Sequence, residues 1–108
     1  MARPQTNQEL HRLADINQVI HASARLMVLI YLYVVESADY VSLIHLTGLT
    51  WGNLSTHLTK LEEAGYVMIK KEFIGKKPHT TISLTKEGRT AFKEYKKTLQ
   101  EVLDDLPD

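Results

Sequence analysis

The chain of 108 residues contains no cysteine. It can therefore form no disulfide, hold no metal ion through thiolates and use no cysteine nucleophile, and it needs no oxidising compartment. A long hydrophobic run is also missing, because the longest one, Leu26 to Val35, falls well short of the roughly 20 residues that a membrane span requires. The first seven residues hold no apolar segment of the kind that a signal peptide needs. These absences predict a cytoplasmic protein without a membrane partner.

An excess of charge of one sign is absent as well, since 13 Lys and Arg balance 13 Asp and Glu. Taken alone, a net charge of zero argues against a nucleic-acid partner. The charges are, however, unevenly distributed. Residues 1–64 carry 4 basic and 6 acidic side chains, residues 65–97 carry 9 and 3, and residues 98–108 carry 0 and 4. The basic excess lies in one part of the chain, so neutrality does not exclude nucleic acid.

Helical spacing dominates the first half of the sequence. A first helix is predicted over residues 7–20, and a second from Ala22 to Ser37, apolar all round and therefore expected to be the buried central helix. A short third helix is predicted from Tyr40 to Thr47, where Gly48 breaks the pattern. The apolar face of the first helix consists of Leu10, Leu13, Asn17 and Ile20.

The spacing of apolar residues changes twice in the second half of the sequence, from helical to alternating and back to helical. Thr50 is a candidate N-cap for a helix over residues 50–64, in which Leu54, Leu58 and Leu61 share one face. Alternating residues then predict two strands, 66–72 and 80–84, joined by a turn-rich basic loop over residues 73–79. A last helix is predicted over residues 85–106, capped by Thr85 and apolar at spacings of three and four.

This order of elements predicts a mainly α fold with a β-hairpin, in the α+β class. The helix-turn-helix spans residues 40–65 and the hairpin, or wing, spans residues 66–84, within a single domain over residues 1–108. The chain thus has the plan of a winged helix-turn-helix.

Several short motifs occur in a characteristic order. They are Ser23-Ala24-Arg25-Leu26, Leu46-Thr47-Gly48-Leu49-Thr50, Leu54-Ser55-Thr56-His57-Leu58-Thr59-Lys60-Leu61-Glu62-Glu63-Ala64-Gly65-Tyr66-Val67, Lys76-Lys77-Pro78-His79-Thr80 and Leu84-Thr85-Lys86-Glu87-Gly88-Arg89. The sequence resembles the small winged-helix transcriptional regulators related to the MarR and ArsR repressors. The resemblance implies a homodimer that binds DNA. MarR-type wings commonly place an arginine in the minor groove, whereas lysines stand at this wing tip.

The predicted helix over residues 50–64 has a slim polar outer face, which a helix needs in order to enter the major groove. Asn53 and Thr56 are the candidates for base contacts, while Ser55, Thr59 and Lys60 are expected at phosphates. The basic residues of the hairpin are expected to hold phosphates; they are Lys70, Lys71, Lys76, Lys77 and His79. The predicted DNA-binding residues are Thr50, Gly52, Asn53, Ser55, Thr56, Thr59, Lys60, Lys70, Lys76, Lys77 and His79. A solvated helix face and a lysine-protected strand edge are the alternatives.

The last helix has too many apolar positions to stand alone in water. It packs either on residues 7–20, on a second copy of the chain, or on both, and the resemblance favours dimerisation through residues 7–20 and 85–106. The predicted interface residues are Leu10, Leu13, Asn17, Phe92, Tyr95, Leu99, Val102 and Leu106. A two-fold dimer would read a pseudo-palindromic operator with half-sites about one helical turn apart.

Enzymatic and metal-binding patterns are weak. The sequence has no nucleophile motif and no phosphate-binding glycine loop, so no catalytic residue and no cofactor are predicted. His11 and Asp15 are one helical turn apart, but two ligands do not make a metal site. The leading hypothesis is a sequence-specific regulator of duplex DNA. The alternatives are a winged-helix module that binds protein, and a regulator with a small-molecule effector at the dimer interface.

Overall fold

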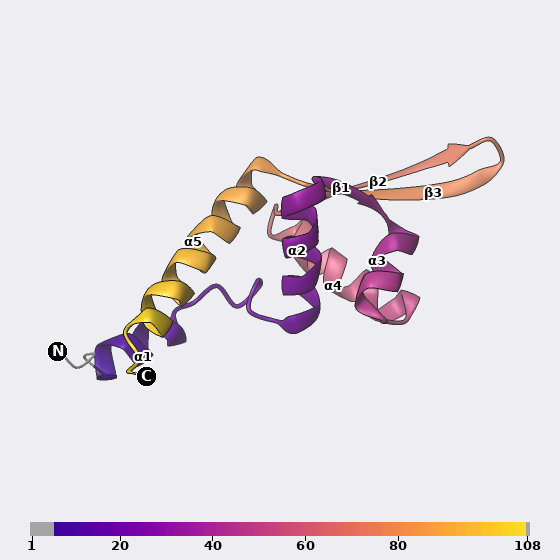
Figure 1. Cartoon of the computed structure of the whole chain (residues 1–108). Coiled ribbons are helices and arrows are strands. Elements are labelled where there is room, and N and C mark those ends of the chain that lie inside the picture. Colours follow the sequence, from indigo (N-terminus) through magenta and orange to yellow (C-terminus); the bar gives the residue numbers. More distant parts are fainter. Residues whose placement is uncertain (1–5, 108) are drawn as a thin grey trace.

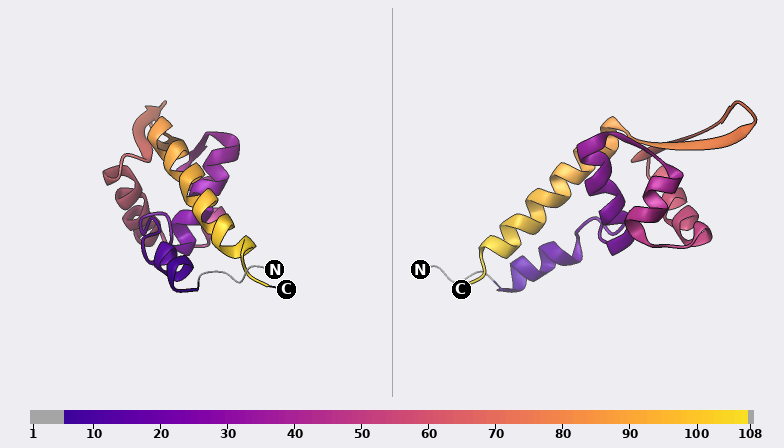
Figure 2. Two further views of the ribbon diagram at one scale, coloured as in Figure 1. Left: turned by 90° about the vertical axis from the view of Figure 1, so that its left-hand side faces the viewer. Right: turned by 45° about the vertical axis from the view of Figure 1, so that its right-hand side comes forward.

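The computed structural model describes residues 6–107 of the chain, which form an elongated molecule measuring 63 × 26 × 21 Å. The hairpin projects from one end, and α1 lies beside the C-terminal half of α5 at the other end (Figures 1 and 2). The predicted winged helix-turn-helix fold is confirmed. The elements are α1 (Thr6–Ala14), α2 (Ser23–Val35), β1 (Ser37–Asp39), α3 (Tyr40–Thr47), α4 (Trp51–Glu63), β2 (Val67–Ile74), β3 (Lys77–Leu84) and α5 (Lys86–Asp104).

The core lies where α2 meets α4 and the root of the sheet. Val28, Leu29 and Leu32 of α2 are buried, and they belong to one cluster with Ile82 of β3. The leucines of α4 that the sequence placed on one face, Leu54, Leu58 and Leu61, are all buried in the same cluster. Burial of this stripe determines which face of α4 points outward.

The prediction that α2 is buried all round is wrong. Val34 is 76% exposed and Ile30 is 49% exposed, so one side of α2 carries apolar residues in contact with solvent. The run from Leu26 to Val35 is apolar at every position, whereas only one stripe of α2 meets α4 and the sheet.

Local hydrogen bonds set the ends of the two helices of the helix-turn-helix. The carboxylate of Asp39 caps α3 by accepting from Ser42 N at 2.7 Å, and hydrogen bonds from Ser42 lower the pKa of Asp39. Gly48 ends α3 with a φ of 70°, a left-handed conformation that glycine adopts without strain. Thr50 then caps α4, as predicted, by accepting from Asn53 N at 3.2 Å.

The hairpin is longer than predicted. Strands β2 and β3 pair from Val67 and Leu84 out to Ile74 and Lys77, so the predicted loop over residues 73–79 is wrong. Only Gly75 and Lys76 connect the strands, and Gly75 has a positive φ of 66° in this two-residue turn. The basic, proline-containing composition of the segment is typical of a loop, so its pairing was not predicted. Pro78 is tolerated in β3 because this part of the strand has an exposed edge.

A short strand that the sequence pattern did not reveal completes the sheet. In the order β1-β3-β2, residues Ser37 to Asp39 pair antiparallel with Ser83 to Thr81. Three residues are too few to show alternation, and their partner strand lies more than 40 positions along the chain. The pairing is therefore decided by tertiary structure.

The predicted helix over residues 7–20 is wrong beyond Ala14, where α1 ends. The amide oxygen of Asn17 accepts from Val19 N at 3.0 Å and Ile20 N at 3.1 Å, and its nitrogen donates to Tyr66 Oη at 2.8 Å. Bonds of this type compete with helical ones and stabilise a turn. Helix α2 likewise spans Ser23–Val35, slightly shorter than predicted.

The start of α5 is held closely against the end of α4. Thr85 Oγ1 donates to the carbonyl of Gly65 at 2.6 Å, and the same oxygen accepts from Gly88 N at 2.9 Å. Gly88 is buried so close to the carbonyl of Tyr66 that an added Cβ would lie 2.1 Å from that oxygen. At its other end α5 is joined to α1 by the ion pair between Arg12 and Glu101, whose hydrogen bond lowers the pKa of Glu101.

Candidate nucleic-acid interface

The outward face of α4 is polar and exposed to solvent. All seven residues predicted there are exposed: Thr50, Gly52, Asn53, Ser55, Thr56, Thr59 and Lys60. An added Cβ at Gly52 would meet nothing within 4 Å, so nothing in the described chain requires glycine at this position. Close approach by a partner is a physical reason for a glycine here.

Hydroxyl groups on this face are already partly engaged. Thr56 Oγ1 donates to the carbonyl of Gly52 at 3.1 Å, which leaves its oxygen free to accept a further bond. Thr50 Oγ1 accepts from Asn53 N, which leaves its proton free to be donated. The side chain of Asn53 has no such bond within the described residues, so both its donor and its acceptor face solvent.

Strand alternation separates the lysines of the wing into two sets. Lys71 shares the face of Ile69, which points toward α4, whereas Lys70 is on the opposite face. Lys70 forms an ion pair with Glu72 at 3.6 Å, and His79 is directly opposite Glu72 in the hairpin. Lys76 and Lys77 lie at the turn. The structure therefore brings Lys71 next to α4 and turns Lys70 and His79 away from it.

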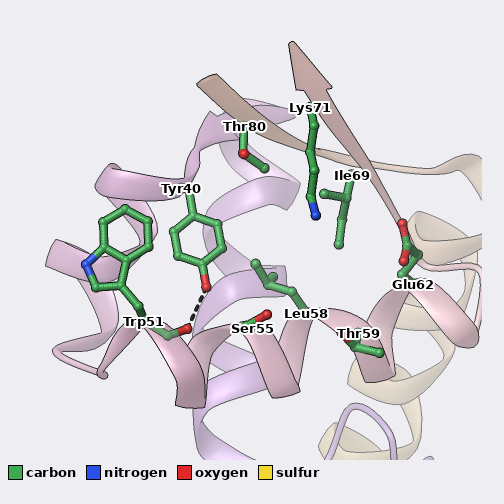
Figure 3. A pocket seen from close by; sticks show the side chains of 9 residues that line it. All are labelled: Tyr40, Trp51, Ser55, Leu58, Thr59, Glu62, Ile69, Lys71 and Thr80. Atoms are coloured by element: carbon green, nitrogen blue, oxygen red, sulfur yellow. Dashed lines mark hydrogen bonds between the residues drawn. The ribbon is translucent and has the colours of Figure 1, made fainter. Parts of the chain in front are cut away.

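A groove of about 510 Å³ lies between α4 and the wing (Figure 3). The side chain of Lys71 reaches down into it from β2, facing the side of α4 that carries Ser55 and Thr59. Lys71 forms no ion pair with any residue in the described part of the chain. Glu62 lies at the end of the groove nearest the C-terminus of α4. The groove is lined by Tyr40, Trp51, Ser55, Leu58, Thr59, Glu62, Ile69, Lys71 and Thr80.

Two aromatic rings form one end of this groove. Tyr40 and Trp51 are stacked with ring centroids 4.7 Å apart and planes 8° from parallel, and Tyr40 Oη donates to the carbonyl of Trp51 at 2.6 Å. Trp51 is nevertheless 60% exposed, so it packs on a neighbour and still offers a face to a ligand. The sequence did not identify Tyr40 or Thr80 as site residues, because no short motif links them to α4.

The predicted dimer residues fall into two groups. Leu10 and Leu106 are exposed and Leu13 and Leu99 are half-buried, so all four have apolar surface available to a partner. Three others, Phe92, Tyr95 and Val102, are buried within the protomer, and Asn17 is engaged in the turn before α2. Burial raises the pKa of Tyr95, whose hydroxyl lies 2.8 Å from His21 Nδ1.

An apolar groove of about 380 Å³ runs between α2 and α5 beside this set. Ile30 of α2 and Leu99 and Leu103 of α5 line it together with Leu26, Phe92 and Tyr95. The sequence did not predict that α2 takes part in this surface. The signal was present, because a helix that is apolar all round has more apolar positions than one packed stripe can bury.

Within residues 6–107, His, Asp and Glu side chains nowhere gather in groups of three that could bind a metal ion. Over the same residues, no helix combines the length and apolar character of a membrane span.

Residues 24–103, which include α4 and the wing, match the family model described as winged helix DNA-binding domain. The chain belongs to this winged-helix family. Its resemblance to winged-helix regulators, inferred from short motifs between Ser23 and Arg89, is therefore confirmed.

Relatives of this winged-helix chain include one archaeal protein described as uncharacterized, MJ0432 of Methanocaldococcus jannaschii. It is 40% identical over 78 residues, which are 72% of this chain and 85% of that protein. A solved structure of a transcriptional regulator homologue from Pyrococcus horikoshii is 28% identical, with a TM-score of 0.81 over 90% of this chain and 95% of that one.

A more distant neighbour is AbfR, solved bound to DNA in its overoxidized form. It is 20% identical, with a TM-score of 0.68 over 94% of this chain and 69% of that one, a likeness of fold alone. Family and fold together support a winged-helix DNA-binding transcriptional regulator.

Proposed function

We propose that the chain is a sequence-specific transcriptional regulator that binds double-stranded DNA as a homodimer in the cytoplasm. The groove between α4 and the wing carries this proposal. A cation without a carboxylate partner, Lys71, faces the hydroxyls of Ser55 and Thr59 across a space open to solvent. One ammonium group and several hydroxyls make a suitable site for a phosphate of the DNA backbone.

The two sides of α4 then have different roles. Asn53 and Thr56 lie on the exposed face beside Gly52 and are proposed to contact base edges in the major groove. Ser55 and Thr59 point toward the wing and are proposed to contact the backbone strand that borders this groove, together with Lys71. Glu62 would repel phosphate, so the strand is expected near Ser55, away from the C-terminus of α4.

The proposed dimer uses the end of the molecule opposite the wing. Leu10 and Leu106 are exposed there, and the groove beside Ile30 and Leu103 adds apolar surface from α2 and α5. Figure 1 shows the wing at the end of the protomer away from α1 and the C-terminus of α5, so a two-fold arrangement through that end would leave both wings uncovered. The DNA site would then be pseudo-palindromic.

A small-molecule effector is a second candidate, favoured by the same apolar groove of about 380 Å³. A neighbour of similar fold, NadR, was solved in complex with 4-hydroxyphenylacetate. An apolar ligand in the groove beside Ile30 would contact the surface that the second copy is proposed to cover. A shift in melting temperature across a panel of aromatic acids tests this function.

The decisive experiment for DNA binding is selection of duplexes from a random library by the purified protein. We expect enrichment of sites with two-fold symmetry. Asn53→Ala should then relax sequence preference, and Lys76→Ala combined with Lys77→Ala should flatten the dependence of affinity on salt. Failure to enrich any duplex at moderate salt would contradict the proposal and favour a module that binds protein.

A further inference from the structure

The outer part of the wing carries an exposed apolar pair on the face that the hairpin turns toward α4. Phe73 is directly opposite Pro78 in the hairpin register, and Lys71 is directly opposite Thr80 closer to the core. Side chains two positions apart on a strand share a face, so Phe73 continues the row of Ile69 and Lys71. Phe73 is 74% exposed. The fold of the protomer does not account for an aromatic side chain so far from the core.

Positive charge surrounds this pair. Lys71 precedes it on the same face, and Lys76 and Lys77 follow at the turn. The one carboxylate on the hairpin, Glu72, is on the opposite face and is paired with Lys70. An apolar tip set among lysines complements a ligand that is anionic outside and apolar within. Duplex DNA, with phosphates around stacked bases, has this character.

The spacing along the hairpin indicates which part of the duplex the pair would meet. If a backbone phosphate lies in the groove at Lys71, as the proposed function states, Phe73 lies about 7 Å farther along the strand. The strand that borders the major groove on one side borders the minor groove on the other, and the minor groove is about 6 Å wide. The pair of Phe73 and Pro78, which lies beyond Lys71 along the hairpin, therefore reaches the minor groove.

We infer that Phe73, supported by Pro78, is an apolar wedge that enters the minor groove and partly unstacks one base step. This inference rests on the proposed function, because it takes the position of α4 in the major groove as given. Wedges of this kind bend the duplex by roughly 20° or more toward the major groove. Pyrimidine–purine steps unstack most readily, so the wedge adds sequence preference through deformability, which lysines alone would not supply.

The test compares three variants on a duplex selected by the wild-type protein and labelled at both ends for energy transfer. Phe73→Ala removes the wedge and should abolish the bend, with an affinity loss on the order of tenfold. Phe73→Leu keeps an apolar side chain and should retain most of both. Ile74→Ala is the matched control, because Ile74 is 61% exposed at the next position on the opposite face. All three should keep the wild-type melting temperature.

The outcomes distinguish failure of the wedge from failure of the proposed DNA-binding function. If the wild-type protein selects no duplex, the proposed function and the wedge both fail. If it binds without bending, or if Phe73→Ala bends DNA as the wild type does, only the wedge fails. A change in the oligomeric state of Phe73→Ala in sedimentation, with DNA bending intact, would instead assign Phe73 to a contact between copies and overturn the inference. A second selection with Phe73→Ala should lose its preference for TA or CA steps at the wing position.

Discussion

Arg25 of α2 and His57 of α4 are in direct contact, with 2.9 Å between Arg25 Nη1 and His57 Nδ1. Arg25 is buried, and its guanidinium also donates to the carbonyls of Val19 at 2.5 Å and Gln18 at 3.4 Å. Since arginine has only donors, Nδ1 of His57 must be the acceptor and its ring must be neutral. One side chain thus connects the turn after α1 with the middle of α4.

This contact predicts a loss of stability in mild acid. Desolvation lowers the pKa of His57 below 6.5, and the charges of Arg25 and Lys60 lower it further. The unfolded imidazole therefore binds a proton at a pH where the folded one does not, so stability falls as the pH drops below about 6.5. Melting curves from about pH 7.5 to about pH 5.5 should show this fall. His57→Gln, neutral throughout, should reduce it, whereas His45→Gln on the exposed side of α3 should not. Identical pH slopes for wild type and His57→Gln would contradict the assignment.

Removal of the arginine itself is expected to be costly at any pH. Arg25→Met retains apolar length but leaves the carbonyls of Val19 and Gln18 without their donor, an expected loss of about 1–3 kcal/mol in the free energy of unfolding. Urea denaturation measures it. Arg89→Met is the control, because Arg89 is only half-buried and makes one long bond to a carbonyl, 3.5 Å to that of Tyr33. Equal losses of unfolding free energy in the two variants would show that the burial of Arg25 does not add to stability.

Two glycines in helices should respond oppositely to the same substitution. Gly52→Ala adds a methyl group in open space and should stabilise the protein by about 0.5–1 kcal/mol while weakening DNA binding. Gly88→Ala places Cβ against the carbonyl of Tyr66 and should cost about 1–3 kcal/mol. Thermal unfolding and a DNA titration on both variants separate stability from binding. A Gly52→Ala protein that binds DNA as the wild type does would remove the case for close approach at this position.

The two adjacent lysines of β2 should differ in their contribution to DNA binding. Lys71→Ala removes the cation in the groove and should lower the slope of log affinity against log salt by about 1. Lys70→Ala should have a smaller effect, because Lys70 is paired with Glu72 on the other face. Binding measured at several salt concentrations distinguishes them. A larger effect at Lys70 would show that DNA approaches the opposite face of the wing.

The apolar groove between α2 and α5 should control the association of two copies of the chain. Ile30→Glu places a charge in the groove between α2 and α5 and should convert the expected dimer into a monomer. Val41→Glu is the matched control, since Val41 is a similarly exposed apolar residue on α3 that does not line that groove. Sedimentation velocity gives the mass of each variant. A wild-type protein that sediments as a monomer at micromolar concentration would exclude the proposed dimer.

The sequence was sufficient where structure depends on local chemistry. The caps of Thr50 and Thr85, the break at Gly48 and the leucine stripe of α4 act over three or four residues, and each is found as predicted. The outward face of α4 followed from the same stripe, so its polar residues could be listed before the fold was known.

Predictions were wrong where a distant partner decides. Helix α1 ends early because Asn17 bonds to the turn and to Tyr66, which is 49 positions away. The hairpin extends to Ile74 because each of its outer residues has a cross-strand partner, a pairing that composition does not encode.

The sequence by itself thus determined the winged helix-turn-helix and the polar face of α4 that points outward, because capping and periodicity operate within single helices. Only the tertiary structure decided which lysine faces the groove, since one step along a strand reverses a side chain. It alone brought Tyr40, Thr80 and Lys71 together from three elements, and it alone left Phe73 exposed beyond them. Sites assembled from separate elements depend on how those elements pack, and packing is a property of the whole chain.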